Sequence, residues 1–215
     1  MKVKVYVEGG GDSKELQARC REGFRKLVER AGFTKPMPAF VACGGRASAY
    51  DRFKTAAGLG GSATYPVLLV DSEYPVEPPP GEEVQPESPT AWEHLKRRDH
   101  WERPAGVEND QAQLMVTSME TWIMADRKAL SRYFGHCLRS NGLLPESALE
   151  TRPRQAVLAS LENATRDCGK GRAYRKGKPS FQLLAQLDPS TLTRHLPYFR
   201  RFVETLGMHL QGSDA

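Results

Sequence analysis

Residues 66–70, Pro-Val-Leu-Leu-Val, form the feature that most constrains the fold, because they are an unbroken apolar run that ends at Asp71. Such a run is typical of a strand that is buried on both faces of a parallel sheet. Residues 2–7 alternate charged or polar with apolar side chains, are rich in valine, and lead into Glu8 and three glycines. This pattern predicts another strand, which leaves the sheet through a tight turn.

A helix is expected between these two strands. Apolar residues recur every three or four positions from Leu16 to Ala31, and Gly32 ends the pattern. Asp12 and Glu15 have the spacing of a capping box, which predicts that the helix starts at Asp12. The chain is therefore expected to begin with a strand, a glycine turn and a helix.

Further elements extend this pattern into a sheet. A short strand is expected over residues 38–43, before Gly44-Gly45 and a second helix, and a fourth strand over 111–118 precedes a helix that opens at Met119. Alternating strands and helices are typical of parallel sheets, which bind ligands beyond the carboxyl ends of their strands. The expected fold class is α/β, with a Rossmann-like, mostly parallel sheet flanked by helices.

The predicted domain organisation has two parts. Residues 1–126 form the α/β domain, with an insertion over 74–110 that is rich in proline and contains one short helix over 92–101. Residues 127–215 form a helical C-terminal extension packed on that domain. Helices in the extension are expected near residues 127–134, 154–165, 180–187 and 196–206.

Composition limits the class of protein. Charged residues make up 27% and hydrophobic residues 39% of the 215 positions, which is a balance typical of globular proteins. No apolar run approaches the length of a membrane span, and Glu8 comes too early for a secretory signal, so we expect a cytoplasmic protein without a membrane partner. The four cysteines contain no Cys-x-x-Cys pair, so neither a zinc module nor disulfide bonds are expected.

Acidic residues follow two of the predicted strands. Glu8 follows the first strand, and Asp71 and Glu73 follow the third. These carboxylates should meet at one edge of the sheet, where their mutual repulsion has to be compensated. Mg²⁺ or Mn²⁺ would compensate it, since Mg²⁺ prefers oxygen ligands and is commonly held by carboxylates together with substrate phosphates. Glu8, Asp71 and Glu73 are therefore predicted as metal ligands and catalytic residues of a phosphate-processing site.

This order of strands and acids resembles the Toprim domain of topoisomerases, primases and overcoming-lysogenisation-defect nucleases over roughly the first 125 residues. Toprim proteins carry a glutamate after the first strand and an Asp-x-Asp after the third, and they bind Mg²⁺ to cleave or transfer phosphodiesters. Glu8 matches the glutamate and Asp71 matches the first aspartate. Glu73 stands where the family has its second aspartate, which leaves the metal geometry open.

The whole chain is similar to a bacterial family of Toprim-like proteins, the domain of unknown function 4276. Four motifs carry this similarity: Val-Tyr-Val-Glu8-Gly, Cys-Gly-Gly-Arg46, Val-Asp71-Ser-Glu73 and Met-Glu120-Thr-Trp122. Members of the family are often encoded beside ATPases. The similarity therefore implies an ATPase partner and a role in defence against phages or mobile elements.

Three further residues have two interpretations each. Glu120, at the start of the helix after the fourth strand, either completes the metal site or interacts favourably with the helix dipole. Asp12 either caps its helix or positions a metal ion or a water molecule. Arg46, near a helix start beside two glycines, either binds phosphate or follows an ordinary strand-to-helix turn.

A basic segment is expected to contact nucleic acid. Between residues 166 and 178 the chain has six cations and one acid, Asp167. Glycines, cations and Tyr174 suit contact with a nucleic-acid backbone and base stacking, although most such segments are solvated loops. No histidine has ligand spacing, so none is assigned to a metal ion, and Trp122 is expected in the core. The residues assigned to phosphate or nucleic-acid binding are Arg46, Lys170, Arg172, Arg175, Lys176 and Lys178.

Three functions are compatible with these residues. The first is a Mg²⁺-dependent nuclease that hydrolyses DNA or RNA as a defence effector. The second is a non-catalytic or partner-activated Toprim-like subunit that binds an ATPase. The third is a small-molecule phosphohydrolase, which would need the metal site but not the basic segment. An oligomer is compatible with each of them.

Overall fold

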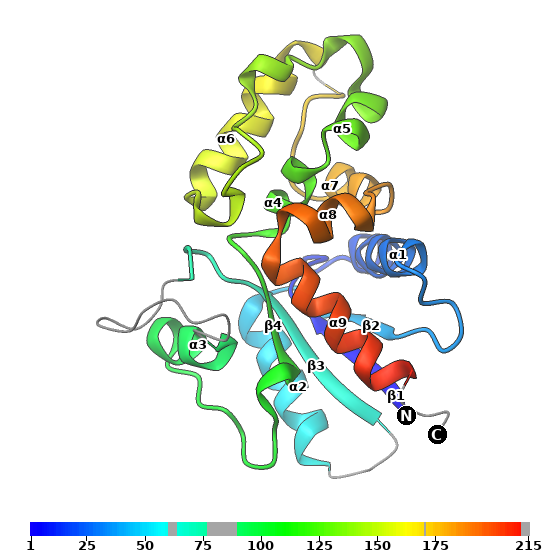
Figure 1. Cartoon of the computed structure of the whole chain (residues 1–215), viewed down its shortest axis with the longest axis vertical. Helices are drawn as coiled ribbons and strands as arrows, with labels where there is room; N and C mark the ends of the chain where they lie inside the picture. Colours follow the sequence, from blue (N-terminus) through cyan, green and yellow to red (C-terminus); the bar gives the residue numbers. More distant parts are fainter. Residues whose placement is uncertain (60–63, 77–89, 170, 212–215) are drawn as a thin grey trace.

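The sheet consists of four parallel strands. The computed structural model of the chain describes residues 1–59, 64–76, 90–169 and 171–211. Within these residues the strands pair in the order β2-β1-β3-β4 (Figure 1). The α/β, Rossmann-like class with a parallel sheet flanked by helices is therefore confirmed. The strands are β1 (Lys2–Val7), β2 (Ala39–Ala42), β3 (Thr64–Asp71) and β4 (Ala112–Met115).

Helices connect and follow these strands. Each strand and helix expected from the sequence is found within a few residues of its predicted bounds, and α8 is an additional helix that the apolar pattern did not reveal. The α-helices of the described residues are α1 (Lys14–Arg30), α2 (Arg46–Gly58), α3 (Ala91–Asp99), α4 (Met119–Ala125), α5 (Arg127–Phe134), α6 (Arg154–Thr165), α7 (Lys178–Leu184), α8 (Pro189–His195) and α9 (Pro197–Gln211).

β3 is buried on both faces, as its apolar sequence predicts. Val67 and Leu69 belong to the apolar cluster under α1 and α9, whereas Leu68 and Val70 belong to the cluster under α2 and α3. All four side chains are inaccessible to solvent. Because helices cover both faces, the run Val67 to Val70 is apolar throughout.

The C-terminal helix α9 covers the sheet beside α1. It packs on β4 and β1 (Figure 1), and its residues Phe199 and Phe202 belong to the same apolar cluster as the strands. Trp122 of α4 is fully buried against both rings, which confirms its predicted place in the core. The apolar residues on either side of the predicted boundary at 126/127 thus share one core, and the division into two domains stays a prediction.

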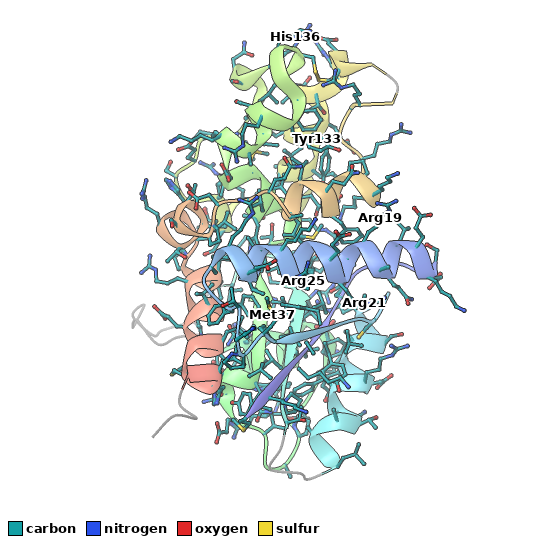
Figure 2. All side chains as sticks on the ribbon, turned by 90° about the vertical axis from the view of Figure 1, so that its right-hand side faces the viewer. Arg19, Arg21, Arg25, Met37, Tyr133 and His136 are labelled. Atoms are coloured by element: carbon teal, nitrogen blue, oxygen red, sulfur yellow. A yellow bond between two sulfur atoms is a disulfide. The ribbon has the colours of Figure 1, made fainter. Side chains whose placement is uncertain are left out.

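Helix α1 lies between the sheet and the C-terminal helices, with Arg21 and Arg25 on its exposed side (Figure 2). Its N-cap is Ser13, whose Oγ accepts from the amide of Leu16 at 3.1 Å. The prediction that Asp12 caps this helix is therefore wrong, because the chain enters the helix one residue later and Ser13 supplies the capping oxygen. Asp12 is exposed, and its role toward a metal ion or water stays a prediction.

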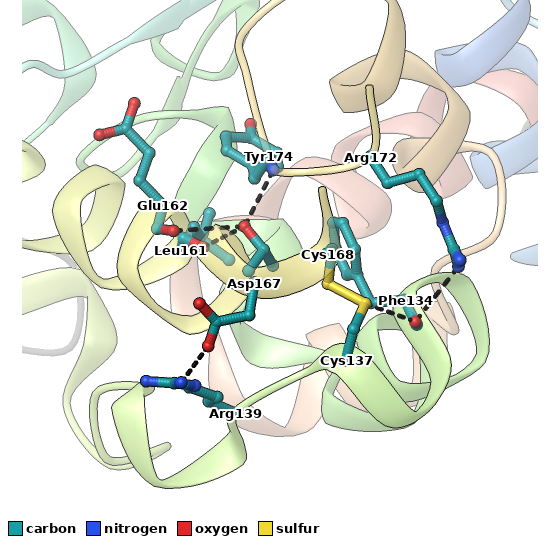
Figure 3. The surroundings of a disulfide bond; sticks show 10 residues. Phe134, Cys137, Arg139, Leu161, Glu162, Asp167, Cys168, Arg172 and Tyr174 are labelled. Atoms are coloured by element: carbon teal, nitrogen blue, oxygen red, sulfur yellow. Dashed lines mark hydrogen bonds and ion pairs between the residues drawn. A yellow bond between two sulfur atoms is a disulfide. The ribbon is translucent and has the colours of Figure 1, made fainter. Parts of the chain in front are cut away.

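The C-terminal part contains a disulfide bond between Cys137 and Cys168 (Figure 3). The expectation that no disulfide forms is therefore wrong. The two residues are 31 positions apart in sequence, but the fold brings their Cα atoms to 5.0 Å, a distance that local spacing does not reveal. Cys20 and Cys43 are free and buried. The expected cytoplasmic location stays a prediction.

The insertion returns to the sheet through α3. Thr90 and Glu93 form a capping box at its start, and Trp92 and Leu95 pack into the cluster under α2. The proline-rich residues 77–89, for which irregular structure is expected, lie outside the described residues. Among the described helices, none combines the length and the apolar character needed to cross a membrane.

Candidate metal centre

Three carboxylates meet at the carboxyl ends of β1 and β3. Glu8 follows β1, Asp71 ends β3, and Glu73 lies two residues further along the chain. Because the two strands are neighbours, the amide of Asp71 donates to Oε2 of Glu8 at 3.2 Å. One ligand atom from each carboxylate lies within 4.8 Å of the other two, so the three side chains form a group that could hold a metal ion.

The loop that carries Glu73 is held from two sides. Glu73 has a φ of 68°, in the left-handed region that non-glycine residues rarely adopt. Its amide donates to the carbonyl of Thr117 at 2.8 Å, and the amide of Ser72 donates to the carbonyl of Met115 at 3.0 Å. From α3, Nε2 of His94 donates to the carbonyl of Ser72 at 2.8 Å. The end of β4 and the insertion thus fix the loop together.

Asp71 is buried in an environment that disfavours its charge. Its Oδ1 accepts from the amide of Met119 at 2.9 Å, at the start of α4. Burial, followed by the neighbouring carboxylates of Glu8 and Glu120, raises the pKa of Asp71 to about 8. A cation beside this carboxyl group would favour the ionised form, so the site is built to gain from a positive ligand.

Arg46 is held between the acids and the insertion. Its Nη1 donates to Oε2 of Glu8 at 3.3 Å and to the carbonyl of Asp71. Its Nε and Nη2 donate to the two oxygens of Asp99 at 3.0 and 2.6 Å, and its guanidinium lies 5.0 Å from the ring centre of Trp101. Through these contacts Arg46 orients Glu8. Its contact with phosphate stays a prediction.

Two glycine turns bring Glu8 and Arg46 together. Gly9 and Gly44 exchange a pair of backbone hydrogen bonds of 2.9 Å, which join the turn after β1 to the turn before α2. Gly44 has a φ of 74°, and a Cβ at this position would lie 2.9 Å from the carbonyl oxygen of Gly11. A larger residue would therefore push the two turns apart.

Among the described residues, each of the three acids has one oxygen without a hydrogen-bond partner. Oε2 of Glu8 and Oδ1 of Asp71 accept the bonds described above, and Oε2 of Glu73 pairs with Arg154 of α6. Across the described ranges, Oε1 of Glu8, Oδ2 of Asp71 and Oε1 of Glu73 make no hydrogen bond to the protein. Open carboxylate oxygens are the ligands that hard divalent cations take, with water completing the shell. The donor set therefore fits a divalent cation such as Mg²⁺.

Glu120 differs from these acids because both of its oxygens are occupied. Oε1 accepts from the hydroxyl of Tyr174 at 3.0 Å, and Oε2 lies 3.3 Å from Nζ of Lys176. Glu120 is 2% exposed and contributes to the raised pKa of Asp71, but it is not a member of the three-carboxylate group. Its assignment as a metal ligand stays a prediction.

The predicted basic segment passes beside this site. Tyr174 is 1% exposed, so the prediction that its ring stacks on a base is wrong. The ring is buried because its hydroxyl reaches both Glu120 and Ser180, and its amide donates to Oγ1 of Thr165 at 2.9 Å. Lys170 lies outside the described residues. The remaining predicted cations of the segment are exposed: Arg172, Arg175, Lys176 and Lys178.

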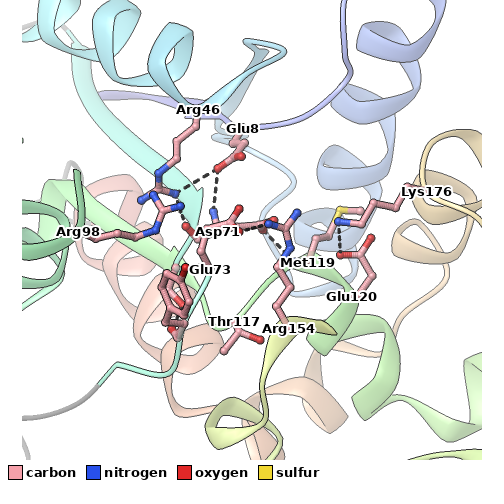
Figure 4. Close-up of polar contacts among 12 residues, drawn as sticks. Glu8, Arg46, Asp71, Glu73, Arg98, Thr117, Met119, Glu120, Arg154 and Lys176 are labelled. Atoms are coloured by element: carbon pink, nitrogen blue, oxygen red, sulfur yellow. Dashed lines mark hydrogen bonds and ion pairs between the residues drawn. The ribbon is translucent and has the colours of Figure 1, made fainter. Parts of the chain in front are cut away.

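A cavity of about 330 Å³ opens beside the acids. Its lining includes Glu8, Asp71 and Glu120 together with two cations of the C-terminal part, Arg154 and Lys176. These two cations lie on one side of the acids, and the guanidinium groups of Arg46 and Arg98 lie on the other (Figure 4). The cavity therefore joins carboxylates that could hold a cation to cations that could hold an anion.

Four residues of the site are absent from the predicted set. Asp99, Arg98 and His94 come from α3, and Arg154 comes from the start of α6. No local motif marks them. One signal was present, because the insertion leaves the sheet at its functional edge, directly after Glu73.

A second group of metal-ligand types lies at the amino ends of the strands. Glu108, Asp110 and His209 each offer an atom within 4.8 Å of the others. Nε2 of His209 donates to Oδ2 of Asp110 at 2.7 Å, and the hydroxyl of Tyr65 lies 2.6 Å from Oδ1 of the same residue. Both oxygens of Asp110 are thus used within the protein.

Comparison with known proteins gives a family match. A family profile described as a domain of unknown function (DUF4276) matches residues 7–207. No curated protein and no solved structure matches the chain. The matched range begins at the last residue of β1 and extends into α9, so it includes the acids, the insertion and the C-terminal helices.

Proposed function

The chain belongs to the DUF4276 family, and we propose that it is a Mg²⁺-dependent, Toprim-like nuclease that hydrolyses phosphodiester bonds of DNA or RNA. The observation that carries the proposal is the group formed by Glu8, Asp71 and Glu73, in which each carboxylate keeps one oxygen for a cation. The cavity beside this group is lined by cations that suit a phosphate.

Each side chain of the site has a role in this proposal. A Mg²⁺ ion held by the three acids would lower the pKa of a bound water and offset charge on the phosphate. Arg46 and Asp99 fix Glu8, whose free Oε1 has one of two roles: it helps to hold the cation, or, with the cation on Asp71 and Glu73 alone, it accepts a proton from the attacking water or returns one to the leaving oxygen. Arg154 and Lys176 hold the non-bridging phosphate oxygens through charge-assisted hydrogen bonds.

The exposed cations Arg172, Arg175 and Lys178 extend the positive surface away from the cavity. Cations that follow a phosphate backbone bind it largely without regard to sequence, and they make the affinity depend on salt. We assign these residues to the flanking nucleotides of a nucleic-acid substrate.

The experiment is a cleavage assay on the purified chain. Single-stranded DNA, double-stranded DNA and RNA are incubated with Mg²⁺, with Mn²⁺, or with a chelator. The wild type should cut in a metal-dependent manner, and Glu8→Gln and Asp71→Asn should each lose at least about a hundredfold in rate. Asp51→Asn, an exposed acid of α2, is the matched control and should keep full activity. Cleavage that survives Asp71→Asn would rule out the catalytic role of the site.

A small-molecule phosphohydrolase is the competing enzyme class. The observation in its favour is the cavity volume of about 330 Å³, which is within the range of small-ligand pockets. Neutralising Arg172, Arg175 and Lys178 together separates the two classes. A nuclease should bind its substrate more weakly and with a smaller salt dependence, whereas a small-molecule enzyme should keep its activity.

The family resemblance also favours a subunit that is activated by, or only docks on, an ATPase. In its favour, Arg46, Arg154 and Lys176 already pair with acids of the site, so most of its negative charge is compensated without a metal ion. Co-expression with an ATPase encoded nearby tests this dependence, because such a subunit should cut only in the complex or not at all. A phage plaque assay with the Asp71→Asn variant tests the proposed role in defence.

A further inference from the structure

Glu120 lies where a metal ligand could lie, but its carboxylate is already paired with a cation of the protein, Lys176. It opens α4 at the carboxyl end of β4, beside Asp71, and it lines the same cavity. Its two oxygens accept from Tyr174 and pair with Lys176, and its side chain is almost fully buried. We propose that the site binds one divalent cation and that the ammonium of Lys176 occupies the place of a second one at Glu120. This inference rests on the proposed metal site.

The contrast with the other acids supports this division. Glu8, Asp71 and Glu73 each keep one oxygen without a partner in the described part of the chain, whereas Glu120 keeps none. A cation at Glu120 would have to displace Lys176. Three acids thus form the cation site, and the fourth is compensated by the protein itself.

Lys176 is held in place by buried neighbours rather than by its own loop alone. Tyr174, two residues earlier, is anchored inside the protein by Thr165 and by Ser180. Ser180 also accepts from the amide of Gly177, the residue after Lys176. The backbone is thus fixed on both sides of Lys176, which keeps its ammonium within reach of Glu120.

The charge of the site agrees with a single cation. Five carboxylates and four cations of the described residues line the cavity or belong to the ion pairs around it, which leaves one net negative charge when all are ionised. One divalent cation and one phosphodiester monoanion would bring this charge to zero. A second divalent cation would leave two uncompensated positive charges, which a buried site disfavours. The charged groups are Glu8, Asp71, Glu73, Asp99 and Glu120, with Arg46, Arg98, Arg154 and Lys176.

The experiment counts Mn²⁺ ions, so it does not depend on nucleic-acid cleavage. Binding to the purified full chain is followed by calorimetry and by the electron paramagnetic resonance signal of free Mn²⁺. For each protein, the count assigned to the site is the number of bound ions that is lost when Asp71→Asn is added to it. We expect one ion for the wild type, two for Lys176→Ala, and one again for Lys176→Ala combined with Glu120→Gln.

Two further variants make the count specific to the charge at this position. Lys176→Arg keeps a cation beside Glu120 and should bind one ion. Lys178→Ala removes an exposed cation two residues away and should also bind one ion. Thermal unfolding of each variant checks that it is folded before its ions are counted.

The outcomes separate this inference from the proposed nuclease. Two site ions in the wild type, or one in folded Lys176→Ala, would overturn the inference while leaving a metal-dependent nuclease intact. One ion in the wild type and two in Lys176→Ala, without any cleavage of nucleic acid, would support the inference and count against the nuclease. No Asp71-dependent ion at all would overturn both.

Discussion

The two ends of the sheet gather the same kinds of side chain but leave them in different states. At the amino ends, both oxygens of Asp110 are bonded, one to Tyr65 and one to His209 of α9. At the carboxyl ends, Glu8, Asp71 and Glu73 each have one oxygen without a hydrogen-bond partner in the described part of the chain, and Glu8 and Asp71 line a cavity. Residue type alone therefore does not distinguish a ligand site from a structural contact. The difference is whether the protein already satisfies the carboxylate.

This difference assigns a separate task to each end. The group at the amino ends joins α9 to β3 and η1 (Asn109–Gln111), since the ring of His209 also stacks on that of Tyr65 with centroids 3.7 Å apart. The group at the carboxyl ends contains a buried acid whose charge the protein does not fully compensate. The first should respond to substitution with a loss of stability, and the second with a change in cation binding.

The largest expected effect is on the pH dependence of stability in the metal-free protein. The pKa of Asp71 is about 8 when folded, above its ordinary value of 3.8, so the folded state holds this proton more tightly. The free energy of unfolding should therefore fall by a few kcal/mol as pH rises from about 4 to about 8. Urea unfolding at a series of pH values with a chelator measures this slope.

Two comparisons sharpen that measurement. Asp71→Asn should unfold with a much shallower slope over the same pH range, while Asp51→Asn should follow the wild type. Mg²⁺ added at pH 8 should restore stability to the wild type and to Asp51→Asn but not to Asp71→Asn, because the cation binds only the folded, intact site. An equal slope in Asp71→Asn would show that the carboxyl ends are as well compensated as the amino ends.

A smaller effect is expected from Asp99→Asn at the carboxyl ends. Asp99 accepts from two nitrogens of Arg46, so removing its charge frees this guanidinium to compete with a cation for Glu8. We expect Mn²⁺ affinity to fall about tenfold, a typical cost for a residue that orients a ligand. Calorimetry on Asp99→Asn measures it, with Asp51→Asn as the control. An unchanged dissociation constant would mean that Arg46 does not need Asp99 for its position.

The smallest effect is expected at the amino ends. His209→Ala removes one hydrogen bond to a carboxylate and one ring contact, which should lower the free energy of unfolding by about 1 kcal/mol. Mn²⁺ binding should be unchanged, because the proposed cation site is the group at the carboxyl ends. A loss of bound Mn²⁺ in His209→Ala would contradict the division between the two ends and would identify Glu108, Asp110 and His209 as a metal site.

The fold was largely predictable because its signals are local. The apolar run over 66–70, the alternation over 2–7 and the helical repeats from Leu16 onward each depend on residues that are neighbours in the chain. The proximity of Glu8, Asp71 and Glu73 was predictable because the carboxyl ends of parallel strands lie at one edge of the sheet. The helix start at Ser13 and the extra helix α8 show where local patterns lose precision.

The partners of these acids were not predictable in the same way. Arg46 reaches Asp99 across 53 residues, Glu73 reaches Arg154 across 81, and Tyr174 reaches Glu120 across 54. Such pairs are set by the packing of α3, α6 and the segment before α7, and no spacing in the sequence encodes them. The disulfide between Cys137 and Cys168 has the same origin.

The sequence by itself determined that this chain has a parallel sheet with acids at the carboxyl ends of β1 and β3. Only the tertiary structure decided which of those acids remain open to a cation. Glu8 was recognised as an acid at a strand end, and the fold made it one of three carboxylates with a free oxygen, while it gave Glu120 to Tyr174 and Lys176. The physical reason is that hydrophobic periodicity depends on residues that are close in the sequence. The compensation of a buried charge depends instead on every segment that packs around it.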